Sequence, residues 1–127
     1  MPPSFRPAYE KLREGGWIGC INNPEYGGMG LPGVVGTAIN EFFFGANMAI
    51  SLTALLTRGA AYLIEESGTD EMRSLFCEKM YSGQWAGTMC LTEPESGSYL
   101  ADIKTSARRD GKTFKIKGTK VFIGTGD

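Results

Sequence analysis

Histidine is absent from the 127 residues of this chain. Because a Ser-His-Asp triad, a Cys-His pair and most zinc sites need an imidazole, these kinds of chemistry are excluded within this sequence. Cysteine is scarce, and the three thiols of Cys20, Cys77 and Cys90 show no Cys-x-x-Cys spacing. An odd number of separated cysteines predicts free thiols in a reducing compartment, with neither a disulfide framework nor a metal site.

An excess of charge and a long hydrophobic run are also missing. The formal net charge is −1 and the basic residues are scattered, which argues against a nucleic-acid partner. No apolar stretch reaches the length needed to span a membrane. The first residues lack a charged start followed by an apolar block, so no secretory signal is predicted and a cytoplasmic protein is expected. With 42% hydrophobic residues, the chain has an ordinary globular composition.

The first two thirds of the sequence predict helices. A short helix is expected over residues 9–14 and a glycine- and proline-rich loop over residues 24–33. Residues 34–67 are apolar on most faces, which predicts two buried helices broken near residues 45–47. Residues 69–81 predict an amphipathic helix capped by Thr69. One face of that helix is expected to carry Met72, Leu75, Phe76 and Met80.

The remainder predicts strands. These are expected over residues 85–91, 104–109, 113–117 and 120–123, with a hairpin turn at Asp110-Gly111. Helices followed by strands indicate an α+β protein: a partial helical bundle in residues 1–83, then the first strands of a β-barrel or sandwich domain in residues 84–127. The buried helices need more bundle, and the strands need more sheet, than the chain supplies. We therefore expect a part of a longer protein.

Two glycine-containing loops are candidate binding sites. The segment Gly28-Met-Gly-Leu-Pro-Gly33 formally fits a dinucleotide fingerprint, but no strand is predicted before it and Pro32 interrupts it, which favours a packed loop. The segment from Thr92 to Ser98 follows a predicted strand, so its N–H groups and hydroxyls could meet a heterocycle or a phosphate. From the residues alone, an ordinary turn is the commoner interpretation.

Several motifs in order resemble the FAD-dependent acyl-CoA dehydrogenase family, and together they cover nearly the whole chain. They are Pro24-Glu-Tyr-Gly-Gly-Met-Gly-Leu31, Thr92-Glu93-Pro94 with Gly97-Ser98, Ile103-Lys104-Thr105, and Gly118-Thr-Lys-Val-Phe-Ile123. In that family a T-E-P-x-x-G-S-D loop precedes I-K-T, a hairpin and an N-G-x-K-x-W/F-I-T/S segment. Phe122, where many members have Trp, is closest to the longer bacterial branch.

The resemblance implies which residues face the cofactor and the substrate. The positions matching Met89, Leu91 and Thr92 lie along the flavin, those matching Gly97 and Ser98 contact the FAD pyrophosphate, and those matching Phe122, Ile123 and Gly124 pass beside the flavin ring. Without the family, ordinary strand packing is the favoured interpretation of Met89, Leu91, Phe122 and Ile123. A fatty acyl chain is expected along the helix at Leu52, Leu55, Leu56 and Gly59, which are also candidates for the bundle core.

The sequence departs from the family pattern at a few of these positions. Tyr99 replaces the usual Asp after Gly-Ser, and Glu95 and Ser96 replace the common Gly-Ala. Gly124 stands where a Thr or Ser usually offers its hydroxyl to the flavin, and Thr125 follows one residue later. The resemblance therefore implies either a shifted hydroxyl at Thr125 or the loss of that hydrogen bond.

The resemblance also implies the reaction, which is α,β-dehydrogenation of an acyl-CoA in lipid metabolism. A glutamate takes the α-proton, the flavin takes the β-hydride, and an electron-transfer flavoprotein or, in an oxidase, oxygen accepts the electrons. That glutamate lies in a C-terminal domain with no counterpart here, so no catalytic residue and no metal ligand is assigned in this chain. We expect the chain alone to be inactive, to bind FAD poorly and to form a homo-oligomer. The alternative is a non-catalytic, self-associating module that binds no flavin.

Overall fold

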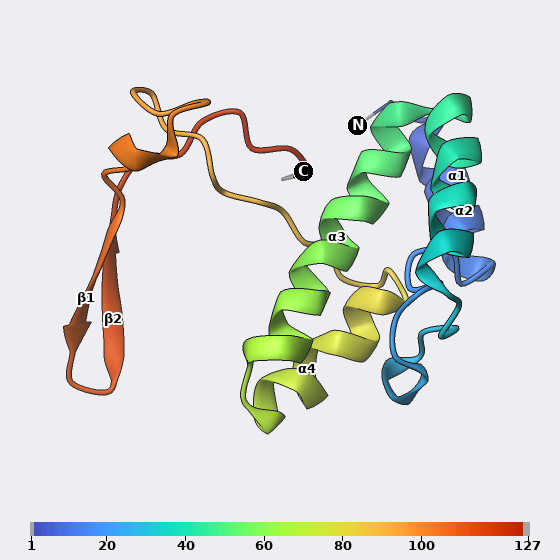
Figure 1. The fold of residues 1–127 in the computed structure, drawn as a ribbon, viewed down its shortest axis with the longest axis horizontal. Helices are drawn as coiled ribbons and strands as arrows, with labels where there is room; N and C mark the ends of the chain where they lie inside the picture. The colour runs from blue at the N-terminus through green and yellow to red at the C-terminus, as the bar shows by residue number, and fades with distance from the viewer. Residues whose placement is uncertain (1, 126–127) are drawn as a thin grey trace. The chain divides into compact units, whose positions relative to one another are not determined.

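The computed structural model describes residues 2–125 as two compact units, one extending to Thr88 and one beginning at Met89. Residues 1, 126 and 127, which fall in the expected domain ranges 1–83 and 84–127, lie outside the described residues. Four α-helices precede an antiparallel hairpin, so the predicted α+β class is confirmed (Figure 1). The expected domain division at residue 84 stays a prediction.

The first unit is built around one long helix. Its elements are α1 (Phe5–Glu14), the short 3-10 helix η1 (Pro24–Tyr26), α2 (Gly33–Ala46), α3 (Met48–Ser67) and α4 (Asp70–Tyr81). Helix α3 contacts α1, α2 and α4 (Figure 1). The predicted break between the two apolar helices is confirmed at Asn47, whose side chain accepts the Ile50 N–H at 3.1 Å. The predicted Thr69 cap is also confirmed, since its hydroxyl accepts the Met72 N–H at 3.3 Å.

The core of this unit lies between α3 and α4. Its buried residues are Ala61, Cys77, Met80 and Tyr81. The Tyr81 hydroxyl donates a hydrogen bond to the Glu65 carboxylate, and the Cys77 thiol faces the Ala61 carbonyl oxygen at 3.9 Å, so both polar groups in this core have a partner. On the predicted apolar face of α4, Met80 is buried and Phe76 is half-buried, whereas Met72 and Leu75 are 42% and 48% exposed. Helix α4 turns Cys77 and Tyr81 toward α3.

Helices α2 and α3, for which burial needs more bundle than the chain supplies, expose a large part of their apolar surface in this structure. Val34, Phe42, Met48 and Leu63 are each more than 60% exposed, the highest being Phe42 at 78%. Helices α1, α2 and α4 pack against only part of α3, and no other described element contacts it. Apolar surface is therefore left in contact with solvent on both helices.

The loop between α1 and α2 is packed, as predicted for the glycine-rich segment. The N–H of Met29 donates to Gly19 O at 3.2 Å, and that of Leu31 donates to Cys20 O at 3.0 Å. At Gly28 a Cβ atom would come within 2.2 Å of Asn22 O, so only glycine allows the two passes of the loop to approach this closely. No strand precedes this segment within the described residues, which supports the rejection of a dinucleotide fingerprint.

The second unit contains the short 3-10 helix η2 (Leu100–Asp102) and the strands β1 (Ser106–Asp110) and β2 (Thr113–Lys117). The strands pair antiparallel with Asp110 opposite Thr113 across a turn that contains Gly111 at φ 63°, which confirms the predicted hairpin. All ten strand residues are exposed. None of the described helices is long and apolar enough to cross a membrane.

The expected strands over residues 85–91 and 120–123 are wrong, because neither segment pairs in a ladder within the described residues. A strand needs a neighbour to satisfy its N–H and C=O groups. Trp85 instead packs edge-on against Phe76, with ring centroids 5.7 Å apart. Phe122 has φ 56°, a left-handed conformation that ends any extended run.

Candidate functional site

A tight turn opens the segment that the sequence singles out as a binding loop. Glu93 and Ser96 exchange backbone hydrogen bonds of 3.0 and 3.1 Å, and the Ser96 hydroxyl donates to Tyr99 O at 2.7 Å. Gly97 and Ser98 follow this turn and are exposed. A Cβ atom at Gly97 would meet nothing within 4 Å. The backbone after the turn is therefore exposed, and no other described residue occupies the space beside Gly97.

The carboxylate of Glu93 is the centre of a hydrogen-bond network. Glu93 is only 5% exposed, and its oxygens accept the N–H groups of Lys104 at 2.7 Å and Thr105 at 2.9 Å. The Lys120 ammonium lies 2.9 Å from the same carboxylate. Charge-assisted hydrogen bonds of this kind are about twice as strong as neutral ones. One side chain therefore joins three segments that are separate in the sequence.

The electrostatic state of Glu93 follows from this network. The Thr105 hydroxyl faces the carboxylate, although outside hydrogen-bonding geometry. Interaction with Thr105, followed by the Lys104 N–H and the Lys120 ammonium, lowers the pKa of Glu93 from its usual value to about 2. A carboxylate held this firmly in its ionised form is a weak proton acceptor near neutral pH.

Lys120 extends the network to the two segments that the resemblance places beside the flavin. Its ammonium donates to Leu91 O at 2.9 Å, and the next N–H, of Val121, donates to Thr92 O at 3.0 Å. Leu91 and Thr92 are therefore held against the stretch that continues into Phe122. The structure brings together two sets of predicted site residues that lie about thirty positions apart.

The apolar members of this set are not buried within their own unit. Met89 is 60% exposed and Phe122 is 93% exposed, so the described residues do not bury either side chain. Ile123 is half-buried and Gly124 is exposed. Phe122 has φ 56° and Thr125 has φ 61°, an uncommon conformation for residues with a Cβ. Backbone strain of this kind clusters at sites that contact ligands.

Gly118 shows how closely two of the motifs approach. A Cβ atom there would lie 2.0 Å from the Thr105 Oγ1 and 2.8 Å from the Thr105 Cα. Such contacts are well inside van der Waals distance, and the Cα belongs to the main chain and cannot swing away. The glycine is thus required by the approach of the segment at Thr105 to the segment before Lys120.

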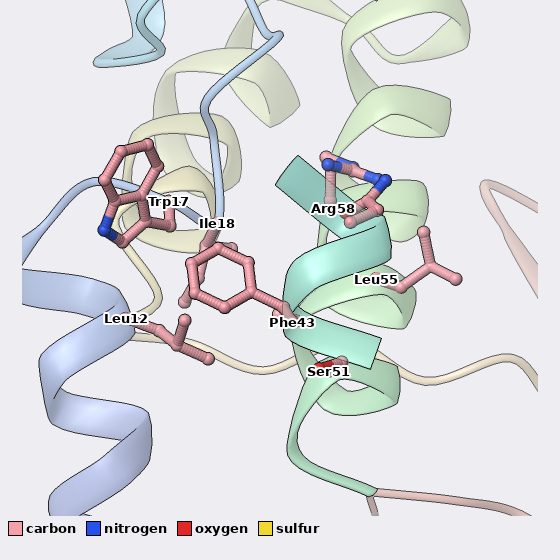
Figure 2. A pocket seen from close by; sticks show the side chains of 9 residues that line it. Leu12, Trp17, Ile18, Phe43, Ser51, Leu55 and Arg58 are labelled. Atoms are coloured by element: carbon pink, nitrogen blue, oxygen red, sulfur yellow. The ribbon is translucent and has the colours of Figure 1, made fainter. Parts of the chain in front are cut away.

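The predicted substrate residues lie on α3, in the first unit. Leu55 and Gly59 line one groove of about 340 Å³ together with Arg58. Leu55 and Arg58 also line a small neighbouring cavity of about 20 Å³, room for about one water molecule. Figure 2 shows the cavity with Leu12 of α1, Trp17 and Ile18 of the following loop, and Phe43 of α2. Leu52 is 39% exposed and Leu56 is half-buried.

Sequence reasoning missed Arg58 and Asn22, both of which line the larger groove. A signal for Arg58 was present, because it is the only charged residue between Met48 and Ile64 of an otherwise apolar helix. Asn22 had no such signal, since its burial depends on the path of the loop. Among the described residues no cluster of acidic residues or cysteines could hold a metal ion.

Comparison with known families decides the identity of the fold. The family described as "Acyl-CoA dehydrogenase, N-terminal domain" matches residues 1–84, two thirds of the chain. The chain belongs to the acyl-CoA dehydrogenase family. The resemblance inferred from the motifs is thereby confirmed, and the glycine-rich loop and all four α-helices lie in the matched region.

Relatives in the acyl-CoA dehydrogenase family match the second unit as well. The 3-methylmercaptopropionyl-CoA dehydrogenase of Ruegeria pomeroyi is 39% identical over all of this chain and 22% of its own length. A butyryl-CoA dehydrogenase of Syntrophomonas wolfei is 36% identical over 99% of this chain and 21% of its own length. The crystal structure of glutaryl-CoA dehydrogenase from Mycobacterium smegmatis superposes with a TM-score of 0.86 at 29% identity, over 97% of this chain and 31% of that one. The chain spans about a fifth of the curated relatives' length.

Proposed function

We propose that this chain supplies flavin-facing and acyl-facing surfaces of an enzyme that dehydrogenates an acyl-CoA thioester between its α and β carbons. The observation that carries the proposal is the junction at Glu93 and Lys120, which holds Leu91 and Thr92 against the segment leading to Phe122. These are the positions that the family resemblance places along FAD. When bound, FAD would accept the β-hydride of the substrate.

The chain's own residues would bind and orient the cofactor. Backbone donors and the Thr92 hydroxyl would meet the polar edge of the flavin, where preorganised donors favour reduction. Gly97 and Ser98 would accommodate the pyrophosphate, because an exposed glycine with open space around it admits a phosphate closely. The exposed Phe122, with Ile123 and Gly124, would lie beside the ring.

No group in the chain is proposed as the base that takes the α-proton. Glu93 is ionised but occupied by its network, and Glu65 accepts the Tyr81 hydroxyl. The chain alone is therefore expected to show no turnover and to bind FAD weakly. Leu55 and Gly59 supply an apolar wall suited to an acyl chain, and Leu52 and Leu56 extend the same helix. An electron-transfer flavoprotein is the proposed partner of the whole enzyme, which we propose to be a cytoplasmic homo-oligomer.

Titration of the ¹⁵N-labelled chain with riboflavin and with FAD, followed by NMR, tests this proposal at weak affinity. Riboflavin is expected to shift the amides of Met89, Leu91 and Thr92 together with Phe122, and FAD is expected to shift Gly97 in addition. Gly97→Ala should weaken FAD binding and leave riboflavin binding unchanged, because only FAD carries the pyrophosphate. Shifts scattered elsewhere, or none at saturating flavin, would contradict the assignment.

A second candidate is favoured by the exposed apolar surface of α2 and α3. In that alternative, the chain is a non-catalytic module that buries this surface by self-association and binds no flavin. Sedimentation velocity distinguishes the two when it is combined with the flavin titration. A concentration-dependent dimer without flavin shifts supports the module, whereas flavin shifts at the predicted amides support the enzyme.

A further inference from the structure

Arg58 introduces a cation into the apolar surface of α3. The groove of about 340 Å³ that it lines also contains Ile21, Asn22, Leu55, Gly59 and Tyr62. Leu55 and Gly59 are two of the residues assigned to the acyl group, so the guanidinium lies on the same wall as the proposed acyl-facing surface. In the close-up of the adjoining cavity, Arg58 and Leu55 both extend from α3 (Figure 2).

The guanidinium has little to bind within the chain. It is half-buried, and its hydrogen-bond contact is to the Cys20 sulfur at 4.0 Å, where a thiol is a weak acceptor. Arg58 forms no ion pair with an Asp or Glu among residues 2–125. A guanidinium carries five N–H donors and costs free energy when it is removed from water without acceptors. Its forked donors match an anionic oxygen group best.

Asn22 provides an independent second observation in the same groove. Asn22 is 6% exposed, and although its side chain interacts with the Tyr81 hydroxyl, its Oδ1 has no hydrogen-bond partner within the described structure. Its backbone groups are already used, since the N–H donates to Gly19 O at 3.0 Å and the carbonyl accepts from Gly30 N at 2.9 Å. A buried amide oxygen in this state is an acceptor that lacks an N–H or O–H donor.

We propose that the groove between α3 and the loop at Asn22 binds an anionic oxygen group on an apolar chain, with the anion on Arg58 and an adjacent O–H or N–H donor on Asn22. The apolar walls at Leu55 and Gly59 would pack against the chain. Within the proposed dehydrogenase function, on which this inference rests, the anion has two possible sources. It is either a carboxylate at the distal end of the acyl group or the phosphate of the pantetheine arm of CoA.

The test is an NMR titration of the full ¹⁵N-labelled chain with glutarate, malate, pantetheine phosphate and the neutral control butyramide. The anionic ligands are expected to bind roughly tenfold more tightly than butyramide, because only they carry a group that pairs with Arg58 in a forked, charge-assisted contact. Arg58→Gln should remove that preference and leave butyramide binding unchanged, while Arg58→Lys should retain part of it. Asn22→Leu should weaken malate, which has a hydroxyl, more than glutarate, which has none.

The relative affinities of the ligands distinguish the two sources of the anion. Tighter binding of glutarate or malate assigns the anion to the acyl group, and tighter binding of pantetheine phosphate assigns it to the coenzyme. Equal binding of butyramide and the anionic ligands, or a preference that survives in Arg58→Gln, overturns the proposal. Circular dichroism of each variant checks the fold, and the Arg58 pair decides the matter if Asn22→Leu does not fold. The riboflavin titration tests the proposed enzyme function separately. If no flavin binds but the Arg58-dependent preference for anions is observed, only the enzyme assignment is refuted.

Discussion

Gly118→Ala should break the junction that holds the proposed flavin-facing segments together. The new Cβ would lie 2.0 Å from Thr105 Oγ1, 2.7 Å from Thr105 Cβ and 2.8 Å from Thr105 Cα. Rotation of the Thr105 side chain relieves the first contact but not the third, so the two segments must move apart. Overpacking of this kind costs about 1–3 kcal/mol, and a main-chain contact belongs at the upper end of that range.

Hydrogen exchange detects this loss where it occurs. The Thr105 N–H donates to Glu93 and the Val121 N–H donates to Thr92, so both amides report on the junction. A loss of about 1–3 kcal/mol should accelerate their exchange roughly 5- to 150-fold if they open locally. Gly97→Ala is the matched control, because its Cβ has open space within 4 Å and should leave both rates unchanged. Unchanged protection in Gly118→Ala would refute the reasoning.

Three further predictions concern single interactions. The pKa of Glu93 is lowered from 4.5 to about 2, so its network is fully stabilising above pH 4.5 and should weaken as the pH falls toward 2. The Lys104 amide, which donates to Glu93, should then lose protection from hydrogen exchange, and this pH-dependent loss should be absent in Glu93→Gln. Gly87→Ala should lower the free energy of unfolding by about 1–3 kcal/mol, because its Cβ would lie 2.6 Å from the Cβ of Ala60. Gly45→Ala in α2 meets nothing within 4 Å and should raise the free energy of unfolding by about 0.5 kcal/mol. Thermal unfolding followed by circular dichroism measures both changes. Thr69→Ala should lower stability by about 1 kcal/mol in the same assay, since the cap of α4 is lost, and an unchanged midpoint would contradict it.

Local chemistry accounts for the parts of the fold that the sequence predicts. The hairpin at Asp110-Gly111 and the caps at Asn47 and Thr69 each depend on a few adjacent residues, and each is found where the pattern places it, although the Asn47 cap was expected only as a break. The strand expected over residues 85–91 fails for a different reason. Composition alone measures a tendency to extend, but a strand also needs a neighbour, and here Trp85 packs against α4 instead.

A single sequence does not show which elements cover a helix or which distant segments pair. Periodicity makes α2 and α3 look buried, yet Phe42 is 78% exposed, because burial depends on which elements cover a helix. Asn22 looks like an ordinary loop residue, and its buried, unpaired oxygen follows only from the path of the loop past α3. The sequence shows Arg58 as a lone charge in an apolar helix, but it does not show the groove that Arg58 lines.

The Glu93 network gives a physical reason why the three motifs of the second unit occur together. Thr92-Glu93 provides the carboxylate, Lys104-Thr105 provides two N–H donors, and Lys120 provides the cation that also binds Leu91 O. Removing any one of these parts leaves a buried charge or donor without its partner, which is more costly than losing the contact alone. The three motifs therefore constrain one another through structure before any ligand is considered. Flavin binding would then use backbone positions that this junction holds in place, so Lys120→Met should disturb the amides of Leu91 and Thr92 even without flavin, and normal amide shifts in that variant would show that the junction does not hold them.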